Sequence, residues 1–153
     1  MLFRSGGVKE GAPKPDISTV DGLKRALLAA KGVAYTDPAT GATSGTYIDN
    51  LLVRLGIADQ VRPKAKLKPG GHAGDFVASG EADIVLQQAS EIIPVKGVVL
   101  VGPLPAEIQN STTYAAAISS QSKEKGAAKA LIDALTSPAA AAVLKSKGMD
   151  PAK

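Results

Sequence analysis

Apolar positions along this chain alternate between the spacing of helices and short runs typical of buried strands. The predicted helices cover residues 18–31, 46–55, 73–79, 123–135 and 138–147. The predicted strands cover residues 33–35, 65–68, 82–87, 98–101 and 112–118. Residues 1–17 are predicted to be irregular, because glycines and prolines interrupt any regular pattern there. Strands that alternate with helices predict an α/β fold with a layered sheet.

Capping signals support several of these boundaries. Ser18 or Thr19 is the predicted N-cap of the first helix, where a side-chain oxygen accepts from an unpaired backbone N–H. Ser137 followed by Pro138 predicts the start of the last helix, since proline is favoured at the first helical position. Gly56 is a natural left-handed stop for the helix that precedes it.

Three polar loops follow predicted strands and lead into a helix or a turn, and the first two of them contain glycine. The first backbone N–H groups of a helix have no intrahelical partner and therefore bind anions or other acceptors. Several such loops at one end of a sheet predict a small-molecule binding cleft. The candidate ligand-binding residues are Thr43, Ser44 and Gly45 in the first loop, Gly70 and Gly71 in the second, and Gln87 and Gln88 in the third.

The same residues have ordinary structural interpretations. Ser44 and its neighbours are also typical of plain helix capping. Gly70 and Gly71 are also typical of a tight turn. His72 is the only histidine, and it is expected to be an exposed residue in the first turn of a helix.

Composition narrows the possible functions. The chain has 153 residues, which is enough for one domain or for part of a larger protein. There is no cysteine and one histidine, so thiolate zinc sites, cysteine nucleophiles and histidine triads are excluded. We therefore predict no enzymatic activity, no metal and no cofactor. No apolar run approaches the ~20 residues of a membrane-spanning helix, and the first residues do not form a signal peptide.

Charge does not indicate a nucleic-acid partner. The net charge is +4, but lysine and arginine are scattered, and only residues 62–68 form a dense basic run. That run is better explained as an exposed edge strand protected by lysines. Aromatic residues make up 3% of the chain, which argues against a stacking platform for single-stranded nucleic acid.

The order of segments resembles a known family. The resemblance lies in Ala34–Pro38 with Ser44–Ile48, in Phe76–Val85, in Gly97–Pro105 and in Ala130–Ala139. Together, over roughly residues 16–150, these stretches resemble the C-terminal part of a type 2 periplasmic binding protein of the molybdate-binding kind. Members of that family close two α/β lobes around a ligand and deliver it to ABC importers.

The resemblance implies a division of the chain. Residues 18–104 are expected to form the second lobe and residues 105–153 the return segment that belongs to the first lobe, after an irregular segment at 1–17. The opening elements of the first lobe have no counterpart, so we expect a fragment. The apolar side chains of the return segment should then be partly exposed: Tyr114, Ile118, Leu131, Leu135 and Leu144.

The resemblance also implies a function. The predicted role is the solute-binding component of an ABC importer, periplasmic or extracellular, with the permease and a small anionic or polar solute as partners. The family's ligand-contacting loops fall on Ser44 and Gly45 and on Gly70 and Gly71. Gln87 or Gln88 stands where molybdate binders often have tyrosine, so an organic acid suits the site as well as an oxyanion. The alternative role is an effector-sensing domain of a transcription regulator.

Overall fold

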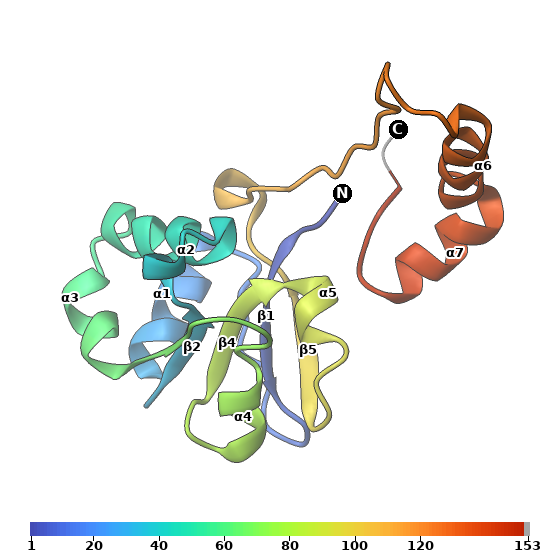
Figure 1. The fold of residues 1–153 in the computed structure, drawn as a ribbon. Coiled ribbons are helices and arrows are strands. Elements are labelled where there is room, and N and C mark those ends of the chain that lie inside the picture. The colour runs from blue at the N-terminus through green and yellow to red at the C-terminus, as the bar shows by residue number, and fades with distance from the viewer. Residues whose placement is uncertain (152–153) are drawn as a thin grey trace.

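A five-stranded sheet forms the centre of the molecule in this computed structural model, which describes residues 1–151 (Figure 1). The strands are β1 (Arg4–Lys9), β2 (Val33–Thr36), β3 (Ala65–Lys68), β4 (Ile84–Gln88) and β5 (Val98–Pro103), in the order β3-β2-β4-β1-β5. Strand β2 runs parallel to β3 and β4, whereas β1 is antiparallel to β4 and β5. The carboxyl ends of β2, β3 and β4 therefore lie at the same end of the sheet, which is called the carboxyl edge below.

Helices cover both faces of this sheet. Helices α1 (Val20–Ala29), α2 (Thr43–Arg54) and α3 (Ala58–Val61) enclose the larger core cluster, and α4 (Asp75–Ser79) and α5 (Ala89–Ile92) enclose the smaller one. Short 3-10 turns lie at η1 (Pro38–Thr40), η2 (Arg62–Lys64) and η3 (Ala106–Ile108). Helices α6 (Lys125–Leu135) and α7 (Pro138–Ser146) form a hairpin that lies apart from the sheet, at the end of a long connection (Figure 1).

Most local signals are confirmed. Thr19 caps α1, since its hydroxyl accepts from the backbone N–H of Gly22 at 3.0 Å. Ser137 caps α7 in the same way, with Pro138 in the first turn. The basic run ends in β3, which is an edge strand whose lysines protect the open side of the sheet.

The prediction that residues 1–17 are irregular is wrong for residues 4–9. These residues form β1, an interior strand that pairs with both β4 and β5. Gly6 and Gly7 interrupt the apolar pattern that would have predicted a strand, but packing requires glycine at both positions. A Cβ on Gly6 would lie 2.8 Å from the side chain of Ile17, and one on Gly7 would lie 2.7 Å from that of Ile92. Glycine therefore lets the covering segments approach both faces of β1 closely.

The predicted strand at residues 112–118 is also wrong. Only Thr112 makes a ladder contact, an isolated antiparallel bridge with Leu2 whose two backbone bonds measure 2.8 and 2.9 Å. Leu2 also bridges Met149. The segment has no sheet neighbour within residues 1–151, so its β-type pattern forms an extended connection. The last two residues of the predicted return segment 105–153 lie outside the described residues.

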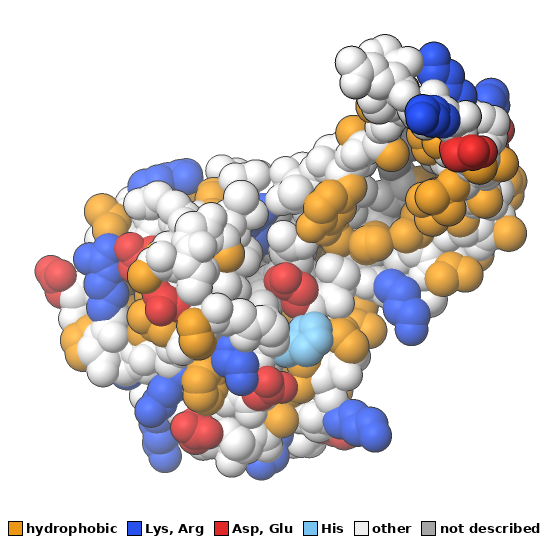
Figure 2. Space-filling model, in the orientation of Figure 1, with side chains coloured by type: hydrophobic (Ala, Val, Ile, Leu, Met, Phe, Trp, Pro, Cys, Tyr) orange, Lys and Arg blue, Asp and Glu red, His pale blue; other side chains and the backbone are white. Residues whose placement is uncertain are grey.

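The α6–α7 hairpin and the connection that leads to it carry exposed apolar side chains, as expected from the sequence. Tyr114 is 74% exposed, Leu131 61% and Leu135 54%, while Ile118 and Leu144 are partly buried. Figure 2 shows hydrophobic side chains gathered on this part of the surface. Within residues 1–151 no single helix is long and apolar enough to cross a membrane, and α6 and α7 pass that test only as a pair bent by 58°.

Candidate functional site

Three predicted site segments meet where β2 and β4 end. Thr36, the last residue of β2, links them: its hydroxyl oxygen lies 3.3 Å from Ser44 Oγ and accepts from Gln87 Nε2 at 3.2 Å. Ser44 lies in the first turn of α2, and Gln87 belongs to β4. The sheet therefore brings together residues from three separate stretches of sequence, and Thr36, which sequence reasoning missed, joins two of them.

Gln87 positions the second loop. Its side chain is almost wholly buried, and its Oε1 accepts from the backbone N–H of Ala73 at 3.0 Å. Its Nε2 also donates to the carbonyl of Gly71 at 3.1 Å. Both amide hydrogens and the amide oxygen are thus engaged within the protein. These bonds fix the path of residues 71–73 beside the start of α2.

Glycines shape the rest of this edge. A Cβ on Gly45 would lie 2.3 Å from the carbonyl oxygen of Thr36, so glycine is needed for α2 to begin against the end of β2. Gly71 has a left-handed backbone, φ 71°, and added Cβ atoms at Gly70 and Gly71 would meet open space. The two glycines form the exposed rim of the site, whereas Gly45 lies beneath it.

The start of α2 has no side-chain cap. Its N-cap is Ala42, whose methyl group accepts no hydrogen bond, and Thr43 at the first helical position is exposed. Unpaired N–H groups at the start of a helix this long attract an acceptor or an anion. This contrasts with α1 and α7, whose capping side chains occupy the same kind of position.

Gln88 lies on the other side of the sheet from Gln87 and caps α5. Its side chain accepts from the backbone N–H of Glu91, and Glu91 Oε2 accepts from the N–H of Gln88 at 3.3 Å, which is a capping box. Burial raises the pKa of the Glu91 carboxyl, against the lowering effects of the Gln88 N–H, His72 and Arg4. Gln88 therefore has a structural role in addition to its place near the site.

Arg4 was missed because its segment was expected to be irregular. It opens β1, directly opposite Gln88 in the register, and its side chain is 1% exposed. Its guanidinium stacks over the ring of Tyr47 at 4.7 Å and donates to the carbonyls of Asn110 and Thr43. The sequence alone does not mark Arg4 as a site residue. Its burial next to the site follows only from the position of β1 between β4 and β5.

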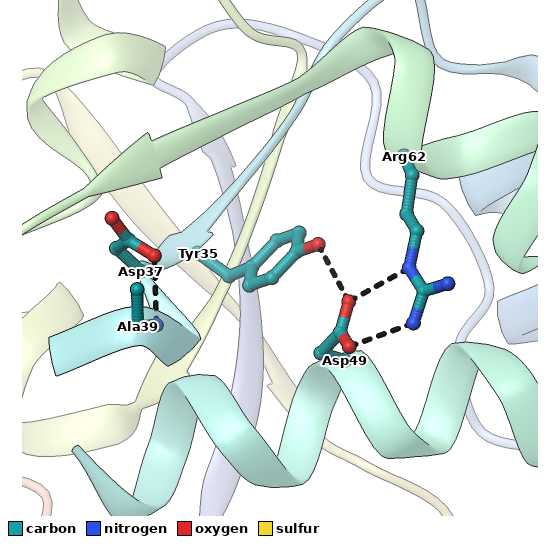
Figure 3. Close-up of polar contacts among 5 residues, drawn as sticks. All are labelled: Tyr35, Asp37, Ala39, Asp49 and Arg62. Atoms are coloured by element: carbon teal, nitrogen blue, oxygen red, sulfur yellow. Dashed lines mark hydrogen bonds and ion pairs between the residues drawn. The ribbon is translucent and has the colours of Figure 1, made fainter. Parts of the chain in front are cut away.

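A separate polar cluster joins β2, α2 and η2 on the outer side of the sheet (Figure 3). Arg62 donates twice to the carboxylate of Asp49, at 3.0 and 2.7 Å, and the Tyr35 hydroxyl donates to the same group at 3.4 Å. The Arg62 hydrogen bond is the main cause that lowers the pKa of Asp49. Burial, followed by the charge of Asp49, raises the pKa of Tyr35 to about 12. This cluster anchors α2.

Two surface hollows lie elsewhere. One of about 560 Å³ lies between Phe3, Ile17 and Pro103, and one of about 520 Å³ lies between Leu2, Tyr114 and Leu144. Neither is lined by Ser44, Gly71 or Gln87. The candidate site is consequently a surface at the carboxyl ends of β2 and β4, formed by loops and the start of α2. A ligand held there would be exposed to solvent unless further protein covered it.

The fold defines a class of protein: α/β modules in which loops gather at the carboxyl ends of parallel strands. Residues 7–150 match the family of bacterial extracellular solute-binding proteins, and the chain belongs to that family.

The chain is similar to three known proteins. It is 39% identical over 150 residues to an aconitate isomerase from a Pseudomonas species, covering 97% of this chain and 56% of that protein. The periplasmic molybdate-binding protein of Azotobacter vinelandii shares 21% identity and a TM-score of 0.65, over 99% of this chain and 67% of that one.

The third relative, from Clostridium difficile, is named as the substrate-binding domain of a molybdenum ABC transporter. It shares 18% identity and a TM-score of 0.76, over 99% of this chain and 64% of that one. Both solved structures therefore share the α/β fold of periplasmic binding proteins, as the sequence predicted. The chain spans little more than half the length of the aconitate isomerase.

Proposed function

We propose that this chain is the solute-binding component of an ABC importer and binds a small anion where β2 and β4 end. The observation that carries the proposal is the uncapped start of α2, with Thr43 exposed there and Ser44 held beside Thr36. The partners are an anionic solute and a permease, and the place of action is periplasmic or extracellular. Residues 18–104 together with β1 act as one lobe, and residues 105–153 return to the other.

In this proposal the predicted residues divide into two groups. Thr43, Ser44, Gly45, Gly70 and Gly71 supply hydroxyl and backbone N–H groups to the ligand. Gln87 and Gln88 act mainly by holding the surrounding backbone, because their amides bond to residues 71–73 and to α5. Such a set of neutral donors suits an oxyanion or a carboxylate.

The ligand is proposed to be an organic acid or a molybdate-like oxyanion. The two structural neighbours are named for molybdate or molybdenum, and the curated relative is named for aconitate. The relative at 39% identity supports the organic acid.

Calorimetric titration of the protein with sodium molybdate, citrate, trans-aconitate and glucose tests this proposal. We expect saturable binding of at least one anion and none of glucose. Ser44→Ala should weaken the anion about tenfold, the value of one lost hydrogen bond to a charged group. Ser79→Ala, at an exposed serine in α4, is the matched control. Absence of anion binding, or equal affinity in both variants, would contradict the proposal.

A second candidate is isomerisation of an organic acid, which the aconitate isomerase relative favours. Such a reaction needs a proton-transfer group, and the half-buried carboxyl of Glu91 is the acidic side chain near this edge with a raised pKa. Proton NMR of trans-aconitate incubated with the protein decides between the candidates. Conversion that Glu91→Gln abolishes would establish the enzyme, and an unchanged spectrum with bound substrate would leave a binding protein.

A further inference from the structure

We propose that the buried guanidinium of Arg4 is the charge-specific anchor of the site and gives it selectivity for anions, carboxylates above all, over neutral solutes. The inference rests on the proposed function, because it assigns a residue and a ligand charge to the same edge. Neither the family match nor the pattern of loops points to this residue.

The first step is an unmet hydrogen-bond donor. The Arg4 side chain is 1% exposed, and among the described residues 1–151 its Nε is the buried side-chain nitrogen or oxygen without a hydrogen-bond partner. Buried donors are almost always paired, and an unpaired one destabilises the fold because it has lost its bonds to water. An unpaired donor on a charged group therefore points to an acceptor that arrives from outside the chain.

The second step is an unbalanced charge. The guanidinium donates to the carbonyls of Asn110 and Thr43 and to the Thr112 hydroxyl, and all three acceptors are neutral. None of the ion pairs within residues 1–151 includes Arg4. Glu91 acts on it only as a more distant charge, and burial is the main cause that lowers the pKa of Arg4. Arginine stays protonated in proteins, so the charge remains.

The third step is location. Arg4 Nη2 lies 3.4 Å from the carbonyl oxygen of Thr43, the first residue of α2, so the guanidinium and the uncapped helix start are neighbours. That contact and the one to Thr112, also 3.4 Å, are long for hydrogen bonds. A carboxylate makes shorter, charge-assisted bonds and would replace them favourably. The planar fork of donors matches the two oxygens of a carboxylate.

The face of the Tyr47 ring completes this pocket for the cation. The guanidinium carbon lies 4.7 Å from the ring centroid, and the Tyr47 hydroxyl donates to the carbonyl of Ile108. The stacked ring keeps the guanidinium in place without neutralising it. The positive charge is thus held beside the helix start, and an anion that displaces the long contacts to Thr43 and Thr112 would meet both.

If Arg4 had only a structural role, its side chain would serve to connect residues 2–4, which lead into β1, to residues 109–112, which follow η3. Gln109 already does so, since its amide accepts from the Arg4 N–H at 2.9 Å and donates to the Arg4 carbonyl at 2.9 Å. The backbone therefore remains tied when the side chain is replaced, and variants at this position are expected to fold.

The test combines affinity with a direct view of the side chain. Citrate and trans-aconitate carry the carboxylates, sodium molybdate is the inorganic oxyanion, and glucose is the neutral probe, each titrated by calorimetry. Arg4→Gln should weaken the carboxylates about tenfold to a hundredfold, and Arg4→Lys should weaken them less, because a charged hydrogen bond is lost or only reshaped. Arg54→Gln, which removes an exposed charge at the far end of α2, is the matched control.

NMR of the Arg4 Nε–H resonance gives a second readout, which is measured on the wild-type protein. The resonance is assigned by its loss in Arg4→Lys. It should shift on addition of citrate to the wild-type protein. An unmoved resonance with citrate bound, or full carboxylate affinity in Arg4→Gln, would overturn the anchor while leaving the binding function intact. Tighter binding of molybdate than of carboxylates would overturn the ligand class. Failure of the wild type to bind any anion would remove both.

Discussion

Residues 1–108 and residues 109–151 both form regular helices from local sequence signals, but only the first region packs into a buried core. The first region contains every buried residue of the described chain, and most of its buried apolar residues form two clusters, one on each face of the sheet. The second contains two regular helices, one with a serine cap, but no buried residue among those described. Helices take most of their stability from packing, so local signals form α6 and α7 without fixing them to the sheet.

Hydrogen exchange should show the largest difference between the two regions. Backbone amides of β1, β2 and β4 open only when the sheet unfolds, whereas those of α6 and α7 open locally. With a global stability of about 5–15 kcal/mol, we expect protection in the strands to exceed that in the hairpin by a thousandfold or more. Equal protection measured by mass spectrometry would mean that the hairpin is held by contacts the fold does not account for.

A matched pair of leucines sharpens the comparison. Leu52 of α2 is fully buried and Leu131 of α6 is 61% exposed. Leu52→Ala should lower the free energy of unfolding by about 2–5 kcal/mol through lost burial and a cavity. Leu131→Ala should change it by less than about 0.5 kcal/mol. Urea unfolding followed by circular dichroism measures both, and a large loss in Leu131→Ala would contradict the separation of the two regions.

A matched pair of glycines follows. Gly45→Ala places a Cβ against the carbonyl of Thr36, and we expect a loss of about 1–3 kcal/mol of unfolding free energy from overpacking. Gly126 in the first turn of α6 faces open space, and alanine is the better helix former. Gly126→Ala should therefore raise exchange protection in α6 alone, without moving the urea midpoint of the sheet. A neutral Gly45→Ala would show that α2 does not depend on this close approach.

The smallest expected effect concerns two ion pairs. Hydrogen bonds from Arg62 lower the pKa of Asp49 in the folded state, so the pair stabilises the fold above the ordinary carboxyl pKa. That contribution is lost as the pH falls through the lowered pKa. Asp49→Asn should make the urea midpoint less sensitive to acid below about pH 4. Asp133→Asn, which removes the exposed Lys129 pair of α6, is the control and should leave that sensitivity unchanged.

Sequence reasoning succeeded where a signal is local. The spacing of Leu23 and Leu27, the cap at Thr19 and the Ser137–Pro138 start predicted α1 and α7 because caps and helical faces are written within a few residues. The apolar run of β4 was equally clear. The position of Ser44 and Gly71 next to strand and helix ends followed as well.

The reasoning failed where a residue depends on partners far along the chain. Gly6 and Gly7 were taken as breakers, but contacts with Ile17 and Ile92 require glycine within an interior strand. Residues 112–118 have a strand-like composition and no neighbouring strand to pair with among residues 1–151. A strand is defined by its partner, and a single segment cannot reveal whether that partner exists.

The sequence by itself determined the α/β alternation, the capped starts of α1 and α7 and the neutral donors around Ser44 and Gly71, because these depend on short-range spacing and backbone chemistry. Only the tertiary structure decided that Gln87 would hold the loop at residues 71–73 and that Thr36 would join it to Ser44. It also decided that Arg4 would be buried beside the start of α2. Burial and the absence of a countercharge arise from packing of distant segments, so they become visible only when the sheet is assembled.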